Sequence, residues 1–317
     1  YKINTMKYYF IVNPNSGKGK GLKLWNRIRT CLNRYGTEYE LFFTDASEDG
    51  AEAAKLLTKD PDSCTGSIYV IGGDDTLNAV LNGLVHMTNV NVGYIPTEPR
   101  EGCARSLRLT GDVKALLKRI RAGGSESGAR IEAVDYGVLT CGNGEIVRRF
   151  VSSTGIGFNA AVRRRMNCDR GGRGESRIKT PLGFVSAVIR ELFFFRPVKG
   201  YILLDGNRRI EFNNILFISV HIHPYEGRYR FANLADPKDG MLEICAVNCR
   251  NRFRLIPLLI RSRFGNLNEC SRVKTYQCSE VRIHLERECA VHTDGDSFGS
   301  IRDMDLRCIR QQLNILR

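Results

Sequence analysis

The chain has 317 residues and a formal net charge of +14, from 48 lysines and arginines against 34 aspartates and glutamates. This length suits one large domain or two modest ones, and the surplus of positive charge favours anionic partners: phosphate-bearing substrates, nucleic acid or an acidic membrane surface. The eleven cysteines include no CxxC pair, which argues against zinc and favours free thiols in a reduced cytosol.

The first part of the chain alternates strands with helices. Apolar runs predict strands over 8–12, 39–44, 68–71 and 91–95. Apolar periodicity predicts a helix that contains Leu24 and Leu32, and further helices over 48–57, 77–85 and 112–121. Strands and helices that alternate at this spacing indicate a doubly wound parallel sheet, so the fold class of this part is α/β.

Two glycine-rich turns follow strands of this part. The segment 13–21 is rich in glycine and lysine, and such a loop can cradle phosphate, although it lacks the Gly-Lys-Ser/Thr end of a P-loop. The turn Gly72-Gly73-Asp74 lies where a strand of an open α/β sheet meets its ligand, so Asp74 is a candidate to hold Mg²⁺ on a nucleotide. We expect Thr76 to cap the helix that follows. The competing interpretation of 13–21 is a flexible surface loop. The competing interpretation of the turn at Asp74 is a tight turn with a solvated acid.

After Gly124 the pattern changes to shorter strands with frequent turns. Strands are expected over 131–140, 145–152, 201–204, 209–212, 215–222, 242–247, 272–278, 281–285 and 289–292. Hairpin turns at this frequency indicate a β-rich, antiparallel, sandwich-like domain. Two helices interrupt it, at 158–166 and at 181–195, the second capped by Thr180.

The change of pattern predicts two domains. A polar linker at 125–129 separates them. We expect residues 1–128, together with about 300–317, to form the α/β domain, and residues 129–299 to form the β-rich domain.

Basic residues gather at 163–179, between the two helices of the second domain. This region is a candidate contact for acidic phospholipids, and a solvated loop is the alternative. Aromatic residues do not alternate with the basic ones, so nucleic acid is not expected as a partner. The most apolar stretch, 181–195, is too short and too charged to span a bilayer, and no signal peptide opens the chain. We therefore expect a cytoplasmic protein, with peripheral membrane contact as an option.

Six elements, in order along nearly the whole chain, resemble the soluble diacylglycerol kinase-like lipid kinases, a family that includes bacterial lipid kinases and sphingosine kinases. Gly72-Gly73-Asp74-Asp75-Thr76 is similar to the family's GGDGT signature, and Asp294-Gly295-Asp296 resembles its late D-G-E element. The other elements are the runs at 11–17, 104–107, 155–160 and 239–243. The resemblance implies a nucleotide-binding α/β domain of the NAD kinase and diacylglycerol kinase type, followed by a β-rich domain, with ATP and the lipid meeting between them.

The resemblance also implies a reaction, cofactors and partners. The γ-phosphoryl group of ATP would pass to the hydroxyl of a diacylglycerol-like or sphingoid lipid at a membrane surface. Asp294 would accept the proton or bind metal, and Asp74 would serve the phosphate–Mg²⁺ network. The nucleotide would be held by residues of the turns, namely Asn13, Ser16, Gly17, Gly72, Gly73, Thr76 and Asn78. A second metal network would involve Asp239, Glu243 and Asp296. The oligomeric state stays open, with a homodimer as one option.

The sequence departs from the family pattern at several positions. Asp75 stands where the family has glycine, and the run 98–102 places two glutamates and a proline where the family has a glycine, a hydroxyl residue and an Asn-Asp pair. His221 and His223 alternate onto one face, which allows either metal binding or two satisfied core histidines. Two hypotheses therefore remain: an ATP-dependent lipid kinase, and a catalytically inactive relative that binds a lipid, a nucleotide or a protein partner.

Overall fold

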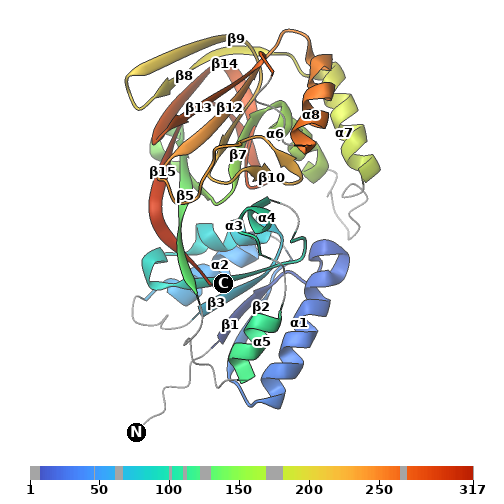
Figure 1. Cartoon of the computed structure of the whole chain (residues 1–317), viewed down its shortest axis with the longest axis vertical. Coiled ribbons are helices and arrows are strands. Elements are labelled where there is room, and N and C mark those ends of the chain that lie inside the picture. The colour runs from blue at the N-terminus through green and yellow to red at the C-terminus, as the bar shows by residue number, and fades with distance from the viewer. Residues whose placement is uncertain are drawn as a thin grey trace. The chain divides into compact units, whose positions relative to one another are not determined.

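The computed structural model describes residues 8–45, 47–60, 67–99, 102–109, 113–121, 130–168, 181–264 and 270–316. The chain forms two compact units, which we call unit 1 and unit 2 (Figure 1). Unit 1 comprises Tyr1–Tyr136 with Arg310–Arg317, and unit 2 comprises Gly137–Ile309. The expected linker at 125–129, Thr180 and most of the basic region at 163–179 lie outside the described residues.

Unit 1 is built on a parallel sheet. Its own strands are β1 (Tyr8–Val12), β2 (Tyr39–Phe43), β3 (Ser67–Gly72) and β4 (Asn91–Pro96), in the order β4-β3-β1-β2. The end of β15 (Asp296–Leu316) adds a further parallel strand, because residues 314–316 pair with 91–93 of β4. This arrangement confirms the expected doubly wound sheet, since each parallel pair among β1 to β4 joins strands that are connected through helices.

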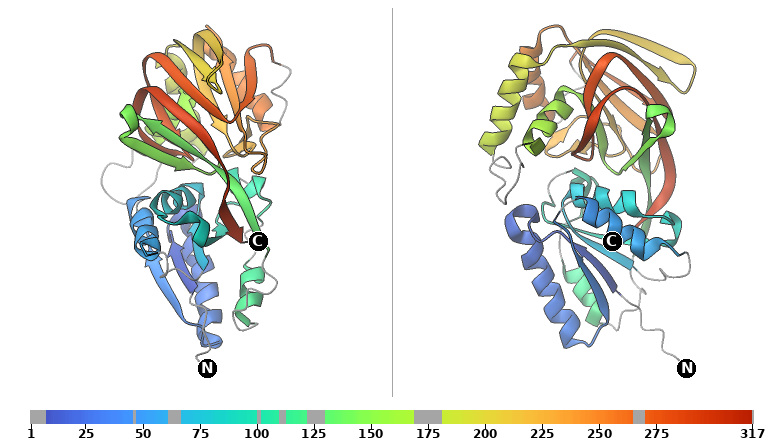
Figure 2. Two further views of the ribbon diagram at one scale, coloured as in Figure 1. Left: turned by 90° about the vertical axis from the view of Figure 1, so that its left-hand side faces the viewer. Right: turned by 180° about the vertical axis from the view of Figure 1, so that it is seen from behind.

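Helices cover both faces of this sheet (Figure 2). They are α1 (Ser16–Arg34), α2 (Ser47–Thr58), α3 (Asp74–Gly83), α4 (Gly102–Ser106) and α5 (Lys114–Arg121), with a 3₁₀ turn at Met87–Asn89. Trp25 of α1 is fully buried and packs its ring against Phe10 and Tyr39, and Leu116 of α5 joins the same core. Helix α2 packs against α3.

The starts of α1 and α3 differ from the expectation. Thr76 does not cap α3, because the helix begins at Asp74 and the extended Gly73 occupies the cap position without a side-chain hydrogen bond. Helix α1 begins at Ser16, but Gly17, Lys18 and Gly19 all have positive φ, so a left-handed turn interrupts its first residues. The glycine-rich segment is thus a tight turn that leads into the helix.

Unit 2 is a β-rich domain whose main sheet is antiparallel. Its strands are β5 (Ile131–Cys141), which begins in unit 1, β6 (Ile146–Phe150), β7 (Ser153–Gly157), β8 (Val198–Leu204), β9 (Arg208–His221), β10 (Tyr225–Glu226), β11 (Tyr229–Arg230), β12 (Leu242–Asn248), β13 (Val273–Cys278), β14 (Glu280–Thr293) and most of β15. The central order is β13-β12-β9-β7-β14-β15. Strands β8 and β7 each pair with both β9 and β14. Strand β8 pairs with the first part of each long strand and β7 with the last part.

Alternate residues of β9 and β12 face two different cores. Ile218 and Ile244 belong to a core between strands, whereas Phe217 and Cys245 belong to a core shared with helices. The helices of unit 2 are α6 (Phe158–Cys168), α7 (Pro181–Phe194) and α8 (Leu255–Arg263), with 3₁₀ turns at Gly142–Gly144 and Arg252–Arg254. At the register shift near Val247 the alternation of β9 slips by one residue, so Leu216 belongs with Phe217 to the helix-side core and Ile215 belongs to the core between strands.

Sequence patterns located most strands of unit 2 but divided two of them, and they did not predict β7, β10, β11 or β15. The expected strands over 209–212 and 215–222 are one strand, β9, and those over 281–285 and 289–292 are one strand, β14, which carries a register shift between His284 and Cys289. Such a bulge allows the polar residues between the apolar runs to stay in the strand. Helix α8 was not predicted.

None of the described helices has the length and apolar character that a membrane span requires. The described cysteines are free thiols.

Candidate functional site

Three loops of unit 1 meet at the ends of β1, β3 and β4. The Asn13 side chain accepts hydrogen bonds from the N–H groups of Asn15 (3.1 Å) and Ser16 (3.0 Å), and its amide donates to Oγ1 of Thr76 (3.4 Å). The hydroxyls of Ser16 and Thr97 lie 2.8 Å apart. The N–H of Thr97 donates to the carbonyl oxygen of Gly72 at 2.9 Å, and its hydroxyl donates to the same oxygen at 3.2 Å.

Glycines allow these loops to approach closely. Gly17 has a φ of 60°, and a Cβ at this position would lie 2.8 Å from Cβ of Thr97. A Cβ on Gly72 would lie 2.4 Å from Oγ1 of Thr76, and one on Gly73 would lie 2.7 Å from Oδ1 of Asp75. The structure thus brings together six of the seven predicted nucleotide-binding residues. The seventh, Asn78, is buried in α3, where its side chain accepts from the amide of Asn82.

The carboxylate of Asp74 ties the start of α3 to two neighbouring segments. Its Oδ1 accepts from the Tyr94 hydroxyl at 3.0 Å, and its Oδ2 accepts from the N–H of Cys103 at 3.0 Å. Burial, and then the negative charge of Asp74, raise the pKa of Tyr94 well above its ordinary value. Gly102 has a φ of 48°, and a Cβ there would lie only 1.6 Å from Oδ2 of Asp74. Sequence patterns missed Tyr94 and Thr97, because no motif marks a partner that lies on another strand.

A second acidic side chain occupies the start of α3. Oδ1 of Asp75 accepts from the N–H of Thr76 at 2.9 Å and lies 3.4 Å from its hydroxyl. The first N–H groups of a helix attract anions, so this carboxylate takes a donor that a phosphate would otherwise use. Of the unusual glutamates in the 98–102 run, Glu98 is exposed, and Glu101 lies outside the described residues.

In unit 2, backbone N–H groups surround the carboxylate of Asp294. Its Oδ2 accepts from Val151 at 2.7 Å, and its Oδ1 accepts from Ser152 and Ser153, both at 2.8 Å. Its own N–H donates to the carbonyl oxygen of Ser153 at 2.8 Å. Asp294 has a φ of 47° and sits in the turn between β14 and β15. The carboxylate is therefore held in one orientation by three consecutive amides.

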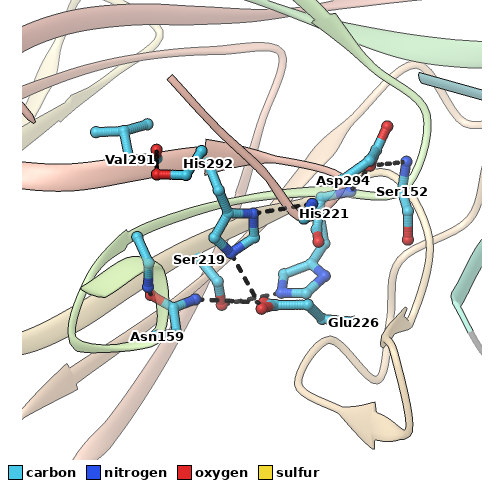
Figure 3. Close-up of polar contacts among 12 residues, drawn as sticks. Ser152, Asn159, Ser219, His221, Glu226, Val291, His292 and Asp294 are labelled. Atoms are coloured by element: carbon cyan, nitrogen blue, oxygen red, sulfur yellow. Dashed lines mark hydrogen bonds and ion pairs between the residues drawn. The ribbon is translucent and has the colours of Figure 1, made fainter. Parts of the chain in front are cut away.

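A buried histidine–glutamate pair supports this turn (Figure 3). The N–H of Gly295, the residue after Asp294, donates to Nδ1 of His292 at 3.2 Å. The acceptor role of Nδ1 leaves the ring proton on Nε2, which lies 3.1 Å from Oε1 of Glu226. Oε2 of Glu226 accepts from the Asn159 amide at 3.3 Å. This chain of contacts connects the start of α6, the β10 hairpin and the Asp294 turn.

A further buried histidine lies beside the pair. His221 is fully buried, with Nε2 at 2.9 Å from the Ser219 hydroxyl and Nδ1 at 3.2 Å from the carbonyl oxygen of His223. Burial lowers the pKa of His221 to about 4. Burial alone would raise the pKa of Glu226, but His292, Arg163 and His221 together lower it to about 2. At neutral pH this region therefore holds a glutamate anion beside a neutral His221.

The predicted metal residues lie in different environments. Asp239 is exposed and accepts from the N–H of Met241 at 2.8 Å. Glu243 is buried on β12, where it accepts from the N–H of Leu234 at 2.7 Å, and burial raises its pKa. Asp296 is half-buried at the start of β15. Within the ranges that the structure describes, no three or more His, Cys, Asp or Glu side chains gather in a way that could hold a metal ion.

Comparison with known proteins adds to this geometry. Residues 7–132 match the family model of the diacylglycerol kinase catalytic domain, and residues 152–317 match that of the YegS C-terminal NAD kinase beta sandwich-like domain. A diacylglycerol kinase of Mycobacterium tuberculosis (strain ATCC 25618 / H37Rv) is 27% identical over 312 residues, which cover 97% of this chain and 94% of that protein.

Other matches are shorter or are structural. A diacylglycerol kinase of Staphylococcus haemolyticus is 33% identical over 109 residues, which cover 34% of this chain and 32% of that protein. A crystal structure of a diacylglycerol kinase from Bacillus anthracis has a TM-score of 0.64 and 19% identity, covers 99% of this chain and 97% of that chain, and so shares the fold.

The position of Asp74 can be tested through Gly102. In Gly102→Ala the methyl group would meet Oδ2 of Asp74, so we expect a loss of about 2–4 kcal/mol in the free energy of unfolding, from strain at positive φ plus overpacking. Gly36→Ala is the matched control, because Gly36 has a φ of 61° and nothing within 4 Å of its Cβ position. Denaturant unfolding of both variants measures the difference, and equal losses would contradict the contact.

Acid should destabilise the protein through His221. Its pKa is lowered from 6.5 to about 4, so the unfolded chain binds this proton more readily than the folded one. The stabilisation by neutral His221 is complete above pH 6.5 and falls by roughly 3 kcal/mol as the pH decreases to 4. His221→Asn should flatten the melting temperature between these pH values. Glu226→Gln should keep a decline below pH 6.5 and extend it to lower pH, because the Glu226 charge that raises the pKa of His221 is gone, and it should lose the decline below pH 4.5 that Glu226 itself causes. An unchanged slope in His221→Asn would refute the assignment.

Proposed function

This chain belongs to the diacylglycerol kinase-like lipid kinase family, and on that basis we propose that it transfers the γ-phosphoryl group of ATP to a lipid hydroxyl. Diacylglycerol-like and sphingoid lipids are the candidate substrates. Relatives that share a fold can differ in activity, so membership of the family does not by itself establish the reaction of this chain.

One observation carries the proposal: the meeting of three loops at the ends of β1, β3 and β4. Ser16, Thr97 and the Gly72 backbone form a continuous hydrogen-bonded junction, and the bare Gly73 precedes α3. Phosphate sites in α/β folds use such a combination of glycine turns, hydroxyl groups and a helix start at the carboxyl edge of the sheet. The seven predicted nucleotide residues, from Asn13 to Asn78, are proposed to hold ATP there.

Mg²⁺ bound to a nucleotide needs only one or two carboxylates besides the phosphate oxygens. Asp74 fits this requirement in type and place, since it lies at the start of α3. The Tyr94 hydroxyl and the Cys103 N–H donate to it and fix the orientation of the carboxylate. Asp239, Glu243 and Asp296 are proposed for a second metal network in unit 2.

Asp294 is proposed as the acceptor of the proton of the lipid hydroxyl. Phosphoryl transfer depends mainly on position and on charge, so a base that cannot turn away from the hydroxyl is an advantage. The three N–H groups of 151–153 supply that orientation.

Peripheral binding to a membrane would bring the protein to its lipid substrate. The basic region at 163–179 is proposed to contact acidic phospholipids there. A homodimer is included in this proposal as one oligomeric option.

One observation favours a second function. Asp75 places its carboxylate on the Thr76 N–H, at the point where the helix start would receive a phosphate. The added negative charge opposes the binding of a triphosphate. The second candidate is therefore a catalytically inactive relative that binds a lipid, a nucleotide or a protein partner.

Nucleotide binding tests the kinase proposal first, because a protein that does not bind ATP cannot transfer its γ-phosphoryl group. With millimolar ATP and Mg²⁺, a working site should raise the melting temperature of the wild-type protein, because ligand that binds only the folded state stabilises it. Asp75→Gly should bind ATP at least about tenfold more tightly, since about 1.4 kcal/mol of repulsion is removed. A shift seen in Asp75→Gly alone would support the inactive relative. No shift in either protein would refute ATP binding.

Asp294→Asn should reduce phosphoryl transfer to diacylglycerol by at least about a hundredfold, because the amide is a poor proton acceptor. An asparagine at this position can also turn its NH₂ toward the N–H groups of 151–153, so the melting temperature is measured alongside. Asp305→Asn is the control, because Asp305 is a surface aspartate whose carboxylate pairs with Arg282. Turnover equal to that of the wild-type protein would remove Asp294 from the reaction.

A further inference from the structure

Helix α7 exposes an apolar stripe. Val185, Ile189 and Phe193 are spaced four residues apart, so they lie on one face of the helix, and their exposed fractions are 50%, 50% and 58%. Phe194 is 71% exposed beside them. A neighbouring side of α7 packs into unit 2 through Ala187 and Leu192, which are buried. The exposed side chains are not among the residues of the buried cores, and half or more of each lies in solvent.

Helix α8 repeats the pattern. Ile256, Ile260 and Phe264 are again four residues apart, with exposed fractions of 46%, 58% and 76%. Leu255 and Leu258 face the core instead. Each of the two helices therefore presents one apolar stripe to unit 2 and a second to solvent.

The two exposed stripes form one surface. The Phe193 ring packs edge-on against Phe253, just before α8, with centroids 5.7 Å apart. Arg252 donates from Nη1 to the carbonyl oxygen of Phe195 at 3.0 Å, which fixes the end of α7 against the start of α8. Figure 1 draws both helices along the same side of unit 2, and both contribute buried residues to one core. We name this surface the α7–α8 face, formed by Val185, Ile189, Phe193, Phe194, Phe253, Ile256, Ile260 and Phe264.

The charges around the α7–α8 face are positive. Residues 250–264 contain five arginines, at 250, 252, 254, 261 and 263, and no acidic residue. The one acid of α7, Glu191, is buried and accepts from Nε of Arg165 at 2.7 Å. Exposed apolar side chains with arginines at their edge match the boundary of an anionic bilayer, where acyl chains lie beneath phosphate groups.

We propose that the α7–α8 face docks on an anionic lipid bilayer, with the apolar stripes in the headgroup–acyl boundary and the arginines on lipid phosphates. A second copy of the chain fits less well, because two such faces would oppose one arginine cluster with another. The inference rests on the proposed function for the choice of a bilayer, and it concerns residues other than those of the basic region at 163–179.

Vesicle sedimentation without ATP tests the face separately from the kinase activity. The wild-type protein should bind vesicles of phosphatidylcholine mixed with phosphatidylglycerol. The triple variant Ile189→Gln/Ile260→Gln/Phe264→Gln should bind at least about tenfold more weakly, because three apolar side chains no longer leave water. The matched control is Leu56→Gln/Val147→Gln, which removes apolar side chains that are 65% and 54% exposed elsewhere.

A second pair of variants tests the charge. Arg254→Gln/Arg261→Gln should weaken binding to the anionic vesicles by roughly tenfold or more, with little change on pure phosphatidylcholine. Arg27→Gln/Arg29→Gln removes the same charge from exposed positions of α1 and should leave binding nearly unchanged.

The outcomes separate the possibilities. The docking proposal would be refuted if the wild-type protein failed to bind vesicles, or if the control variants weakened binding equally. A dimer in light scattering that the triple variant converts to a monomer, with no vesicle binding, would assign the face to a second copy and also overturn it. Vesicle binding lost in the triple variant would support it even in a protein without kinase activity, so the two proposals fail independently.

Discussion

Hydrogen bonds from backbone amides to a few carboxylates organise the loops of both units. Asp74 holds the start of α4, Asp294 holds the turn at 151–153, and Glu243 holds Leu234. A loop without a sheet or helix partner must satisfy its N–H groups elsewhere, and an acidic side chain is the strongest local acceptor. The acids that the family resemblance marks for chemistry are thus also those that shape the loops around it.

Much of the architecture could be predicted because it depends on local pattern. Apolar runs marked the strands of unit 1, and the change to short strands after Gly124 marked the β-rich part. Some errors came from contacts between residues that are distant in sequence, since Thr97 and Tyr94 contact residues that follow other strands. Helix α8 was missed for another reason: its exposed face is as apolar as its buried face, so the sequence lacks the usual amphipathic pattern. The buried pair His292–Glu226 joins β14 to the β10 hairpin, 66 residues away, and no spacing rule marks it.

Asp75 illustrates how an altered residue can be compatible with an inherited fold. Its carboxylate caps the first turn of α3 from within the helix, so the fold gains a favourable contact at the point where a nucleotide would need an open amide. The same side chain therefore stabilises the helix and opposes a phosphate. The substitution changes one helix turn, while the sheets and cores of the fold stay the same.

The pairing of residues 314–316 with β4 has a consequence for synthesis on the ribosome. Until these residues have emerged, β4 remains an open edge of a parallel sheet whose other strands were translated some two hundred residues earlier. Unit 1 must wait for the whole of unit 2 before its sheet is complete, which exposes a partly folded intermediate to aggregation or to chaperones. A nascent chain released before residue 314 would keep that edge open.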